Sequence, residues 1–354
     1  MKDLIKLYYV SSHSGQEKKM RKYLKGWLKE NVPSAKVVSD QSGIYVTKGI
    51  AESFPCVVAH IDEVHRERNN QFRVARADDY IFGFDLDSKS QYGIGADDKN
   101  GIWVAMQCLL RYDAVKVALF VGEEIGCVGS SQADMSFFSD CRFVVQCDRR
   151  GSSDFISNAS GWELCDDGFM SKIDMARFGY KKATGMMTDV MELKSRGLSV
   201  AACNLSCGYY NPHTSEETTI FSELCNCRDL VFHIIDTVTD VCPHKAQRSY
   251  SVYGGFHRGW NDDDWYGYGD IYDSWPSSRS MSGDAEDGEI ARQFDELVEM
   301  MYLDWYNDPD GFDVVGFYDS WKAEFPDLNY YDFEDALQHL ECYYCDAEEV
   351  AEVK

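Results

Sequence analysis

Seven imidazole and carboxylate side chains lie directly after predicted strands or at the start of a predicted helix. They are His60, Asp62, Asp97, Glu123, Glu124, Asp148 and His213. Imidazole nitrogens and carboxylate oxygens are the ligands that zinc takes in hydrolytic sites. If the fold brings these side chains together, the chemistry that they favour is metal-assisted hydrolysis.

The elements that would position these side chains follow from short apolar segments. Residues 56–59, 115–121 and 143–145 are apolar runs typical of buried strands. Residues 102–110 are apolar at helical spacing, and residues 199–205 form a further predicted strand. The alternation predicts an α/β fold, with a mostly parallel central sheet sandwiched by helices. In such sheets the functional groups gather beyond the carboxyl ends of the strands.

A basic amphipathic helix is predicted near the start of the chain. Ser14-Gly15-Gln16-Glu17 has the pattern of a capping box, in which Ser14 accepts the amide of Glu17 and the Glu17 carboxylate reaches back. Apolar side chains then recur on one side of the helix, at Met20, Tyr23, Leu24, Trp27 and Leu28.

Taken singly, each chemical motif has an ordinary structural interpretation. Adjacent carboxylates such as Glu123-Glu124 commonly begin a helix, where the helix dipole favours them. Asp97-Asp98 could cap a helix in the same way, and His213 follows a proline, as many loop histidines do. Their joint occurrence at predicted strand ends favours a shared site over coincidence.

Five motifs occur in a fixed order along the first part of the chain. They are Ala59-His60-Ile61-Asp62, Gly95-Ala96-Asp97-Asp98-Lys99-Asn100-Gly101, Gly122-Glu123-Glu124-Ile125-Gly126, Cys147-Asp148 and Tyr210-Asn211-Pro212-His213-Thr214-Ser215-Glu216. With these motifs the sequence resembles the co-catalytic zinc exopeptidases, which include peptidase T, dipeptidases and carboxypeptidase G. The resemblance covers about residues 1–245 and implies the α/β fold of that family.

The resemblance also implies a metal centre with two zinc ions, for which Co²⁺ or Mn²⁺ could substitute. Asp97 would bridge both ions. His60 and Asp148 would complete one metal site, and Glu124 and His213 would complete the other. A shared carboxylate suits this arrangement because its negative charge offsets the repulsion between two close dications.

Two further carboxylates receive roles from the same resemblance. Glu123 would be the general base, since a free carboxylate next to a ligating one can take a proton from water and pass it to the leaving amine. Asp62 would orient His60, because a carboxylate two residues away on a strand can fix the tautomer of the ring.

The sequence departs from the peptidase T pattern in the spacing of its last two ligands. Members of that type carry a lid domain between them, whereas Asp148 and His213 are here only 65 positions apart. We therefore expect no lid domain, which leaves the substrate class and the oligomeric state open. Aspartate rather than glutamate at position 148 favours the aminopeptidase and dipeptidase branch of the family.

The charge of the chain is concentrated near its end. Acidic residues outnumber basic ones 60 to 35, and residues 255–354 alone hold 27 acidic and 5 basic residues, a net charge of −22. We expect a catalytic domain over 1–250, an acidic and aromatic linker over 251–288, and an acidic helical region over 289–354. Nucleic acid and anionic membranes would repel such a chain, so neither is expected as a partner.

The N-terminal residues and the cysteines indicate a cytoplasmic protein. Met1-Lys2-Asp3-Leu4 lacks an apolar signal core, and no run of 18 apolar residues occurs. Thirteen cysteines give no even disulfide framework, so we expect them to be reduced and mostly buried in the core.

The function that these observations favour is hydrolysis of short peptides by an aminopeptidase or a di- or tripeptidase. Cleavage of N-acyl amino acids by the same mechanism is the first alternative. A catalytically silent peptidase fold that binds a partner is the second. All five candidate ligands and Glu123 are present, which favours the enzyme.

Overall fold

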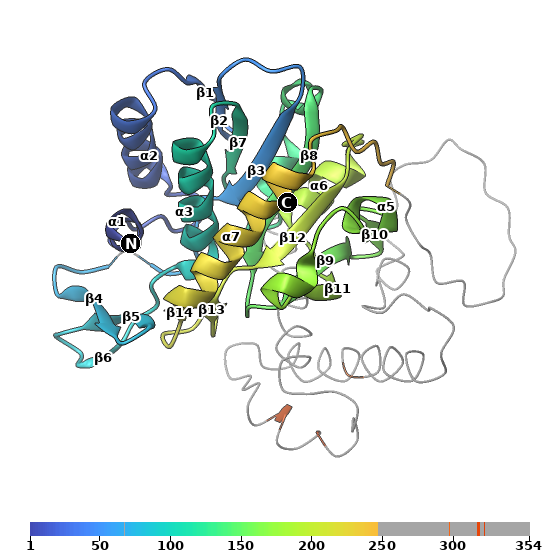
Figure 1. Cartoon of the computed structure of the whole chain (residues 1–354). Helices are drawn as coiled ribbons and strands as arrows, with labels where there is room; N and C mark the ends of the chain where they lie inside the picture. Colours follow the sequence, from blue (N-terminus) through green and yellow to red (C-terminus); the bar gives the residue numbers. More distant parts are fainter. Residues whose placement is uncertain (67, 247–296, 298–316, 319–321, 323–354) are drawn as a thin grey trace, which may run out of the picture. The chain divides into compact units, whose positions relative to one another are not determined.

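The predicted apolar segments form the middle of a nine-stranded sheet (Figure 1). The structure is a computed structural model that describes residues 1–66, 68–246, 297, 317–318 and 322. The strands of this central sheet are β1 (Lys36–Ser39), β2 (Gly43–Lys48), β3 (Phe54–His60), β7 (Val115–Phe120), β8 (Cys141–Arg149), β9 (Asp154–Ala159), β10 (Trp162–Glu163), β11 (Lys181–Gly185) and β12 (Ala202–Ser206). Their order is β1-β2-β7-β3-β8-β12-β9-β10, with β11 paired to β9. The four middle strands run parallel, and antiparallel strands flank them.

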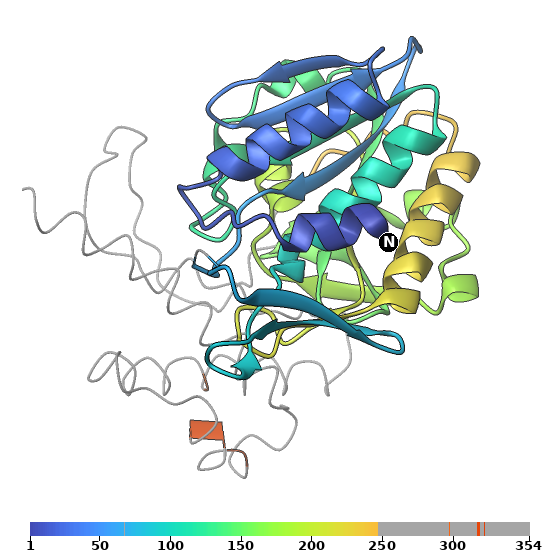
Figure 2. The same ribbon diagram turned by 90° about the vertical axis from the view of Figure 1, so that its left-hand side faces the viewer.

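Helices cover both faces of the central sheet. Alternate side chains of a strand point to opposite faces, so the apolar strands present apolar side chains on both faces, and helices bury them. The helices are α1 (Lys2–Tyr8), α2 (Lys18–Asn31), α3 (Ala96–Arg111), α4 (Val128–Ser131), α5 (Asp167–Met170), α6 (Asp189–Ser195) and α7 (Phe221–Thr237), with 3₁₀ turns η1 (Met135–Phe138) and η2 (Met175–Phe178). Val57 and Ala59 of β3 pack in one apolar cluster with α1, α2, α3 and α7, which Figure 2 shows over one face. Cys56 and Val58 pack in a second cluster with α6. The predicted fold class is confirmed.

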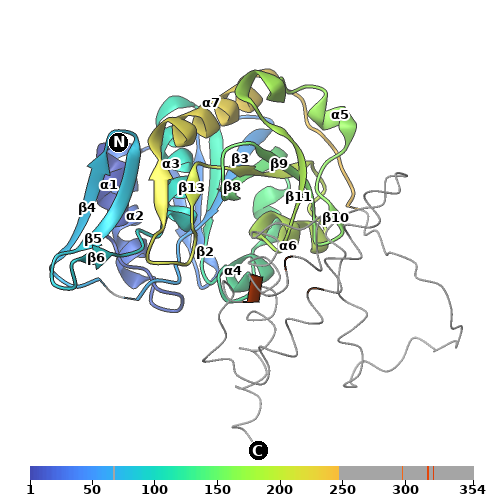
Figure 3. The same ribbon diagram turned by 90° about the horizontal axis from the view of Figure 1, so that it is seen from below.

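A second, five-stranded sheet was not predicted. Its strands are β4 (Phe72–Ala77), β5 (Tyr80–Asp85), β6 (Ser90–Gln91), β13 (Tyr209–Tyr210) and β14 (Thr218–Ile220). The order is β13-β14-β5-β4, with β6 paired to β5. Figure 3 shows β13 next to α3, and β4 and β5 farther from the central sheet. Strands β4 to β6 are inserted between β3 and α3, so this sheet joins two segments that lie far apart in sequence.

The start of α2 differs from the prediction. The helix begins at Lys18, whereas a capping box would begin it at Gly15. Ser14 Oγ donates instead to Asp62 Oδ2 at 2.8 Å, and Glu17 Oε1 accepts the amide of Gly15 at 2.8 Å. The predicted capping box is therefore wrong, because the Ser14 hydroxyl binds a side chain of another segment. The predicted apolar side of the helix is confirmed, since its members are buried or partly buried.

The segment between β8 and β13 is described throughout and belongs to the central sheet. It contributes strands β9, β10, β11 and β12, together with α5, α6 and η2. Within these described residues no separate domain is inserted.

The chain divides into two units, Met1–Gln247 and Arg248–Lys354. The expected linker over 251–288 lies outside the described residues, as does the expected helical region over 289–354 apart from the four residues given above. In the described part of the chain, every cysteine except the half-buried Cys225 is buried, and none forms a disulfide. Among the helices of that part, none is long and apolar enough to cross a membrane.

Candidate metal centre

Four of the seven predicted side chains come from the carboxyl ends of three adjacent parallel strands. His60 is the last residue of β3, and Asp148 lies one residue before the end of β8. Glu123 and Glu124 follow β7 after a short turn. Because β3 pairs with β7 on one side and with β8 on the other, these ends meet at one edge of the sheet. The strand order therefore gathers these four side chains at one place.

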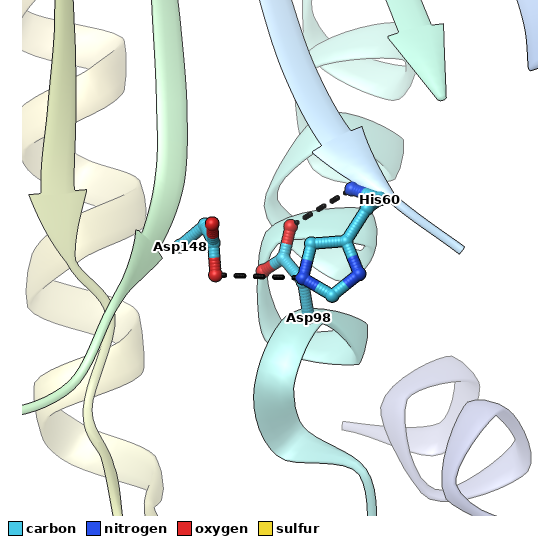
Figure 4. A group of neighbouring side chains, drawn as sticks. All are labelled: His60, Asp98 and Asp148. Carbon is cyan, nitrogen blue, oxygen red and sulfur yellow. Dashed lines mark hydrogen bonds and ion pairs between the residues drawn. The ribbon is translucent and has the colours of Figure 1, made fainter. Parts of the chain in front are cut away.

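The imidazole of His60 lies at the centre of the group, and Figure 4 shows the Asp148 carboxylate directed toward it. His60 Nε2 is 3.0 Å from Asp97 Oδ1 and 3.6 Å from Asp148 Oδ1. His60 Nδ1 faces Asp62, 3.2 Å from its carbonyl oxygen and 3.3 Å from Oδ1. Burial alone would lower the pKa of His60, but the surrounding carboxylates, Asp148 first, raise it well above its usual value.

Asp97 lies between the two predicted histidine ligands. Its Oδ1 faces His60, and its Oδ2 is 3.4 Å from His213 Nε2. Tyr209 donates its hydroxyl to the same Oδ2 at 3.2 Å. Burial would raise the pKa of Asp97, but the facing imidazoles of His213 and His60 lower it well below its usual range. A carboxylate that faces one imidazole from each oxygen has the arrangement expected of a bridging ligand.

His213 comes from the second sheet, in the turn between β13 and β14, and not from the end of a central strand. It has a left-handed backbone, with a φ of 65°. Its Nε2 lies 2.9 Å from Glu124 Oε2, yet this contact lacks hydrogen-bond geometry. Glu124 Oε1 is buried and has no hydrogen-bond partner within the described residues. The two side chains are thus arranged to share a cation more than to bond each other.

Asp98 also lies beside His60, although no ligand role was predicted for it. Its carboxylate could join His60 and Asp148 in holding a metal. However, Asp98 Oδ2 accepts the amide of His60 at 3.2 Å, and Oδ1 accepts the amide of Gly101 at 2.9 Å. Figure 4 shows the carboxylate next to the His60 backbone. Since two backbone amides use both of its oxygens, we interpret Asp98 as an anchor between β3 and α3.

Asp62 organises the loop that carries two other site residues. Its Oδ1 accepts the amide of Glu123 at 3.1 Å, and its Oδ2 accepts the amide of Glu124 at 3.3 Å and the hydroxyl of Ser14 at 2.8 Å. Burial would raise the pKa of Asp62, but the hydrogen bonds of His60, Ser14 and Glu123 lower it. Asp62 therefore holds His60 and the Glu123-Glu124 loop in one fixed relation.

Glu123 is the most open carboxylate among the predicted ligands and base. Its side chain is 14% exposed, against 7% for Asp148 and 4% for Glu124. Its Oε2 lies 4.0 Å from His60 Nε2, at the border of the group. Burial of the group and the negative charges around it raise the pKa of Glu123 well above its usual value.

Asp148 is fixed by a set of polar side chains that sequence reasoning missed. Its Oδ2 accepts from Gln146 Nε2 at 3.0 Å and lies 3.3 Å from Thr188 Oγ1. Its amide donates to Asn204 Oδ1 at 2.9 Å, and its carbonyl accepts from Asn204 Nδ2 at 2.9 Å. Gln146, two residues earlier on the same face of β8, was the one sequence signal available; Thr188 and Asn204 come from distant segments.

The residues present fit a divalent cation. His60 forms one group with Asp98 and Asp148 and another with Asp97 and Glu124, and within each group the ligand atoms all lie within 4.8 Å of one another. Burial, and then the charge of Asp97, raises the pKa of Asp148 to about 8. Crowded buried carboxylates of this kind are stabilised as anions by a bound cation. Nitrogen and carboxylate ligands suit zinc and also suit cobalt or manganese.

Comparison with solved structures identifies the architecture. The aminopeptidase PepT from Bacillus cereus aligns with a TM-score of 0.54 at 14% identity, over 68% of this chain and 98% of that chain. A tripeptidase from Staphylococcus aureus aligns with a TM-score of 0.52 at 14% identity, over 66% and 96%. The chain shares their fold. An aminopeptidase from the archaeon Desulfurococcus kamchatkensis gives 0.52 at 14% identity, over 68% and 98%.

No protein-family profile and no curated protein sequence matches the chain. The identity of 14% in each of these three matches is too low to carry a function from one protein to another. What the comparisons add is therefore the fold on which the seven side chains are placed.

Proposed function

We propose that this chain is a dinuclear zinc metallopeptidase that hydrolyses peptide bonds of short peptides, as an aminopeptidase or a di- or tripeptidase. The observation that carries the proposal is the convergence of His60, Asp97, Glu124, Asp148 and His213 around one small volume, with Asp97 facing both histidines. The fold shared with two aminopeptidases and a tripeptidase supports the same assignment.

In this proposal Asp97 would be shared by the two ions, His60 and Asp148 would complete one site, and Glu124 and His213 would complete the other. Two bound zinc ions would supply a polarised scissile carbonyl and a water acidified to near neutral pH. The buried carboxylates would hold the ions, and Asp62 keeps His60 Nδ1 paired so that Nε2 faces the other proposed ligands.

Glu123 is the proposed general base. It lies next to the ligand Glu124, is partly open, and stands 4.0 Å from His60 Nε2, so its carboxylate borders the metal volume without joining it. Burial and the surrounding carboxylates raise its pKa above the usual value, which makes this carboxylate a stronger base toward water than an exposed glutamate. Asp62 fixes the Glu123 amide and thereby limits where this carboxylate can reach.

The test combines metal content with a substrate panel. The purified full chain should hold two zinc ions by elemental analysis and should cleave di- and tripeptides with a free amino terminus. N-acetylated forms of the same peptides and N-acyl amino acids complete the panel. Faster cleavage of the acylated compounds would replace the peptidase assignment with an amidohydrolase. Two bound zinc ions without turnover of any compound would support the silent binding protein instead.

A further inference from the structure

Glu217 is a buried carboxylate that the proposed mechanism does not use. Its side chain has no exposure to solvent, and it lies four residues after His213 in the same turn. Glu217 Oε2 accepts the amide of Gly95 at 2.5 Å and lies 2.9 Å from His65 Nε2. Glu217 Oε1 accepts the amide of Asp97 at 3.0 Å. The Glu217 carboxylate therefore accepts two backbone amides at the start of α3, those of Gly95 and of Asp97 itself.

This backbone is held from its other side by a second buried charged group. Gly95 has a φ of 63°, and a Cβ atom there would lie 2.0 Å from Glu63 Oε2 and 2.7 Å from Lys99 Nζ. Lys99 Nζ in turn donates to Glu63 Oε1 at 2.8 Å. The peptide that leads into Asp97 is thus fixed between the Glu217 carboxylate and the Glu63–Lys99 ion pair.

The geometry gives Glu217 a positioning role and not a ligand role. Both of its oxygens are engaged by the contacts above, and it belongs to neither of the groups of described side chains that could hold a metal. Its turn also carries His213, whose Nε2 lies 3.4 Å from Asp97 Oδ2. Glu217 therefore sets the position of Asp97 relative to His213, because it accepts the backbone amide of Asp97 and belongs to the turn that carries His213.

We propose that Glu217 is the positioning residue for the bridging carboxylate Asp97, and that it tunes the affinity and geometry of the metal centre. This inference rests on the proposed dinuclear site. Residues that orient metal ligands without touching the metal typically change metal affinity by about 10–100-fold when they are mutated. The substitution Glu217→Gln removes the charge and turns one oxygen into a donor, which then faces an N–H group.

The experiment compares Glu217→Gln with Glu216→Gln in the full chain. Glu216 is the preceding residue and is exposed, so the control makes the same chemical change outside the network. Zinc dissociation constants are measured by competition with a chromophoric chelator, at a temperature where circular dichroism shows both metal-free variants folded. The ligand-field spectrum of the Co²⁺-loaded proteins reports the geometry of the centre independently of activity.

We expect Glu217→Gln to weaken at least one zinc site by about 10–100-fold and to change the cobalt spectrum. Glu216→Gln should stay within about threefold of the wild type, as surface substitutions do. If Glu217→Gln matches the control in both readouts, even with a lower melting temperature, the role is only structural and the inference is overturned. If the wild type binds no metal, the dinuclear centre itself fails and the inference falls with it.

Glu217→Asp serves as a second variant if the glutamine variant does not fold. It keeps the charge but is one methylene shorter, so it cannot reach both amides in the observed backbone. We expect a weaker zinc site in the same direction. Wild-type zinc affinity together with a wild-type cobalt spectrum in Glu217→Asp would also overturn the inference.

Discussion

Substitution of Glu63 by glutamine should strongly destabilise the metal-free protein. Glu63 has no solvent exposure and accepts two hydrogen bonds from Arg68, at 2.8 and 2.5 Å. Its Oε1 also lies 2.8 Å from Lys99 Nζ and accepts the amide of Ser12 at 2.9 Å. Glu63→Gln therefore removes the counter-ion of the buried Arg68 cation and of Lys99, whose pKa burial already lowers to about 7, while the volume of the side chain hardly changes.

Breaking a buried ion pair from one side typically lowers the free energy of unfolding by about 3–5 kcal/mol. For a domain of roughly 150–250 residues this corresponds to a melting temperature lower by about 6–20 °C. The penalty should also depend on pH. Burial would raise the pKa of Glu63, but Lys99 and Arg68 lower it to about 2. A carboxyl group whose pKa is lowered by folding stabilises the folded state at pH values above its unfolded pKa, which is 4.5 for glutamate. The difference in unfolding free energy between wild type and variant should therefore shrink as pH falls below about 4.5.

Urea unfolding followed by circular dichroism, with a chelator present to remove metal, measures this difference. Asp236→Asn is the matched control, because its ion pair with Arg111 is about half exposed on both sides and should contribute little. Adding Lys99→Met to Glu63→Gln removes one stranded cation and should recover part of the loss. An unfolding free energy for Glu63→Gln equal to that of the control would refute the argument that this network is stabilised by charge.

Three further outcomes are expected. Glu123→Gln should keep both metals and the melting temperature but lower kcat by about 10²–10⁴-fold, and near-normal turnover would show that another group is the base. Gly95→Ala should lower the urea midpoint far more than Gly197→Ala, because both sites have left-handed backbones but only the Cβ at Gly95 meets a charged side chain; equal midpoints would contradict this. A chain ending at Gly254 should still bind two zinc ions, since all proposed ligands lie in Met1–Gln247, and a folded truncation without zinc would argue against a modular tail.

The four middle strands of the central sheet could be predicted because they are short, continuous apolar runs. Each run around His60, Glu123 and Asp148 is bounded by polar residues, so both the strand and the side chains at its end are visible in the sequence. Parallel order then implies that neighbouring carboxyl ends meet, which is what the pairing of β3 with β7 and β8 produces.

The second sheet could not be predicted in the same way. Strand β5 alternates buried and open residues over Tyr80–Asp85, but its partner β14 has only three residues and lies more than 130 positions later. Pairing between such distant segments leaves no local pattern. The same reason hides Glu217, whose partners Gly95 and Asp97 are also far away in sequence. The capping role of Ser14 was predicted wrongly, because the sequence does not show whether its hydroxyl bonds the nearby helix start or a carboxylate far away in the chain.

Because His213 comes from the second sheet, the proposed metal centre would link the second sheet to the central sheet. His60 precedes strand β4, Asp97 follows strand β6, and His213 lies between β13 and β14, so three proposed ligands sit where the chain enters, leaves or turns within that sheet. Ions held by these side chains would tie the small sheet to the end of the central one. Chelation should therefore speed hydrogen exchange at the amides of β5 and β14 while leaving those of β3 and β8 protected. In this chain a bound metal would stabilise the second sheet as well as assist the reaction, because the turn that carries His213 leads directly into β14, which pairs with β5.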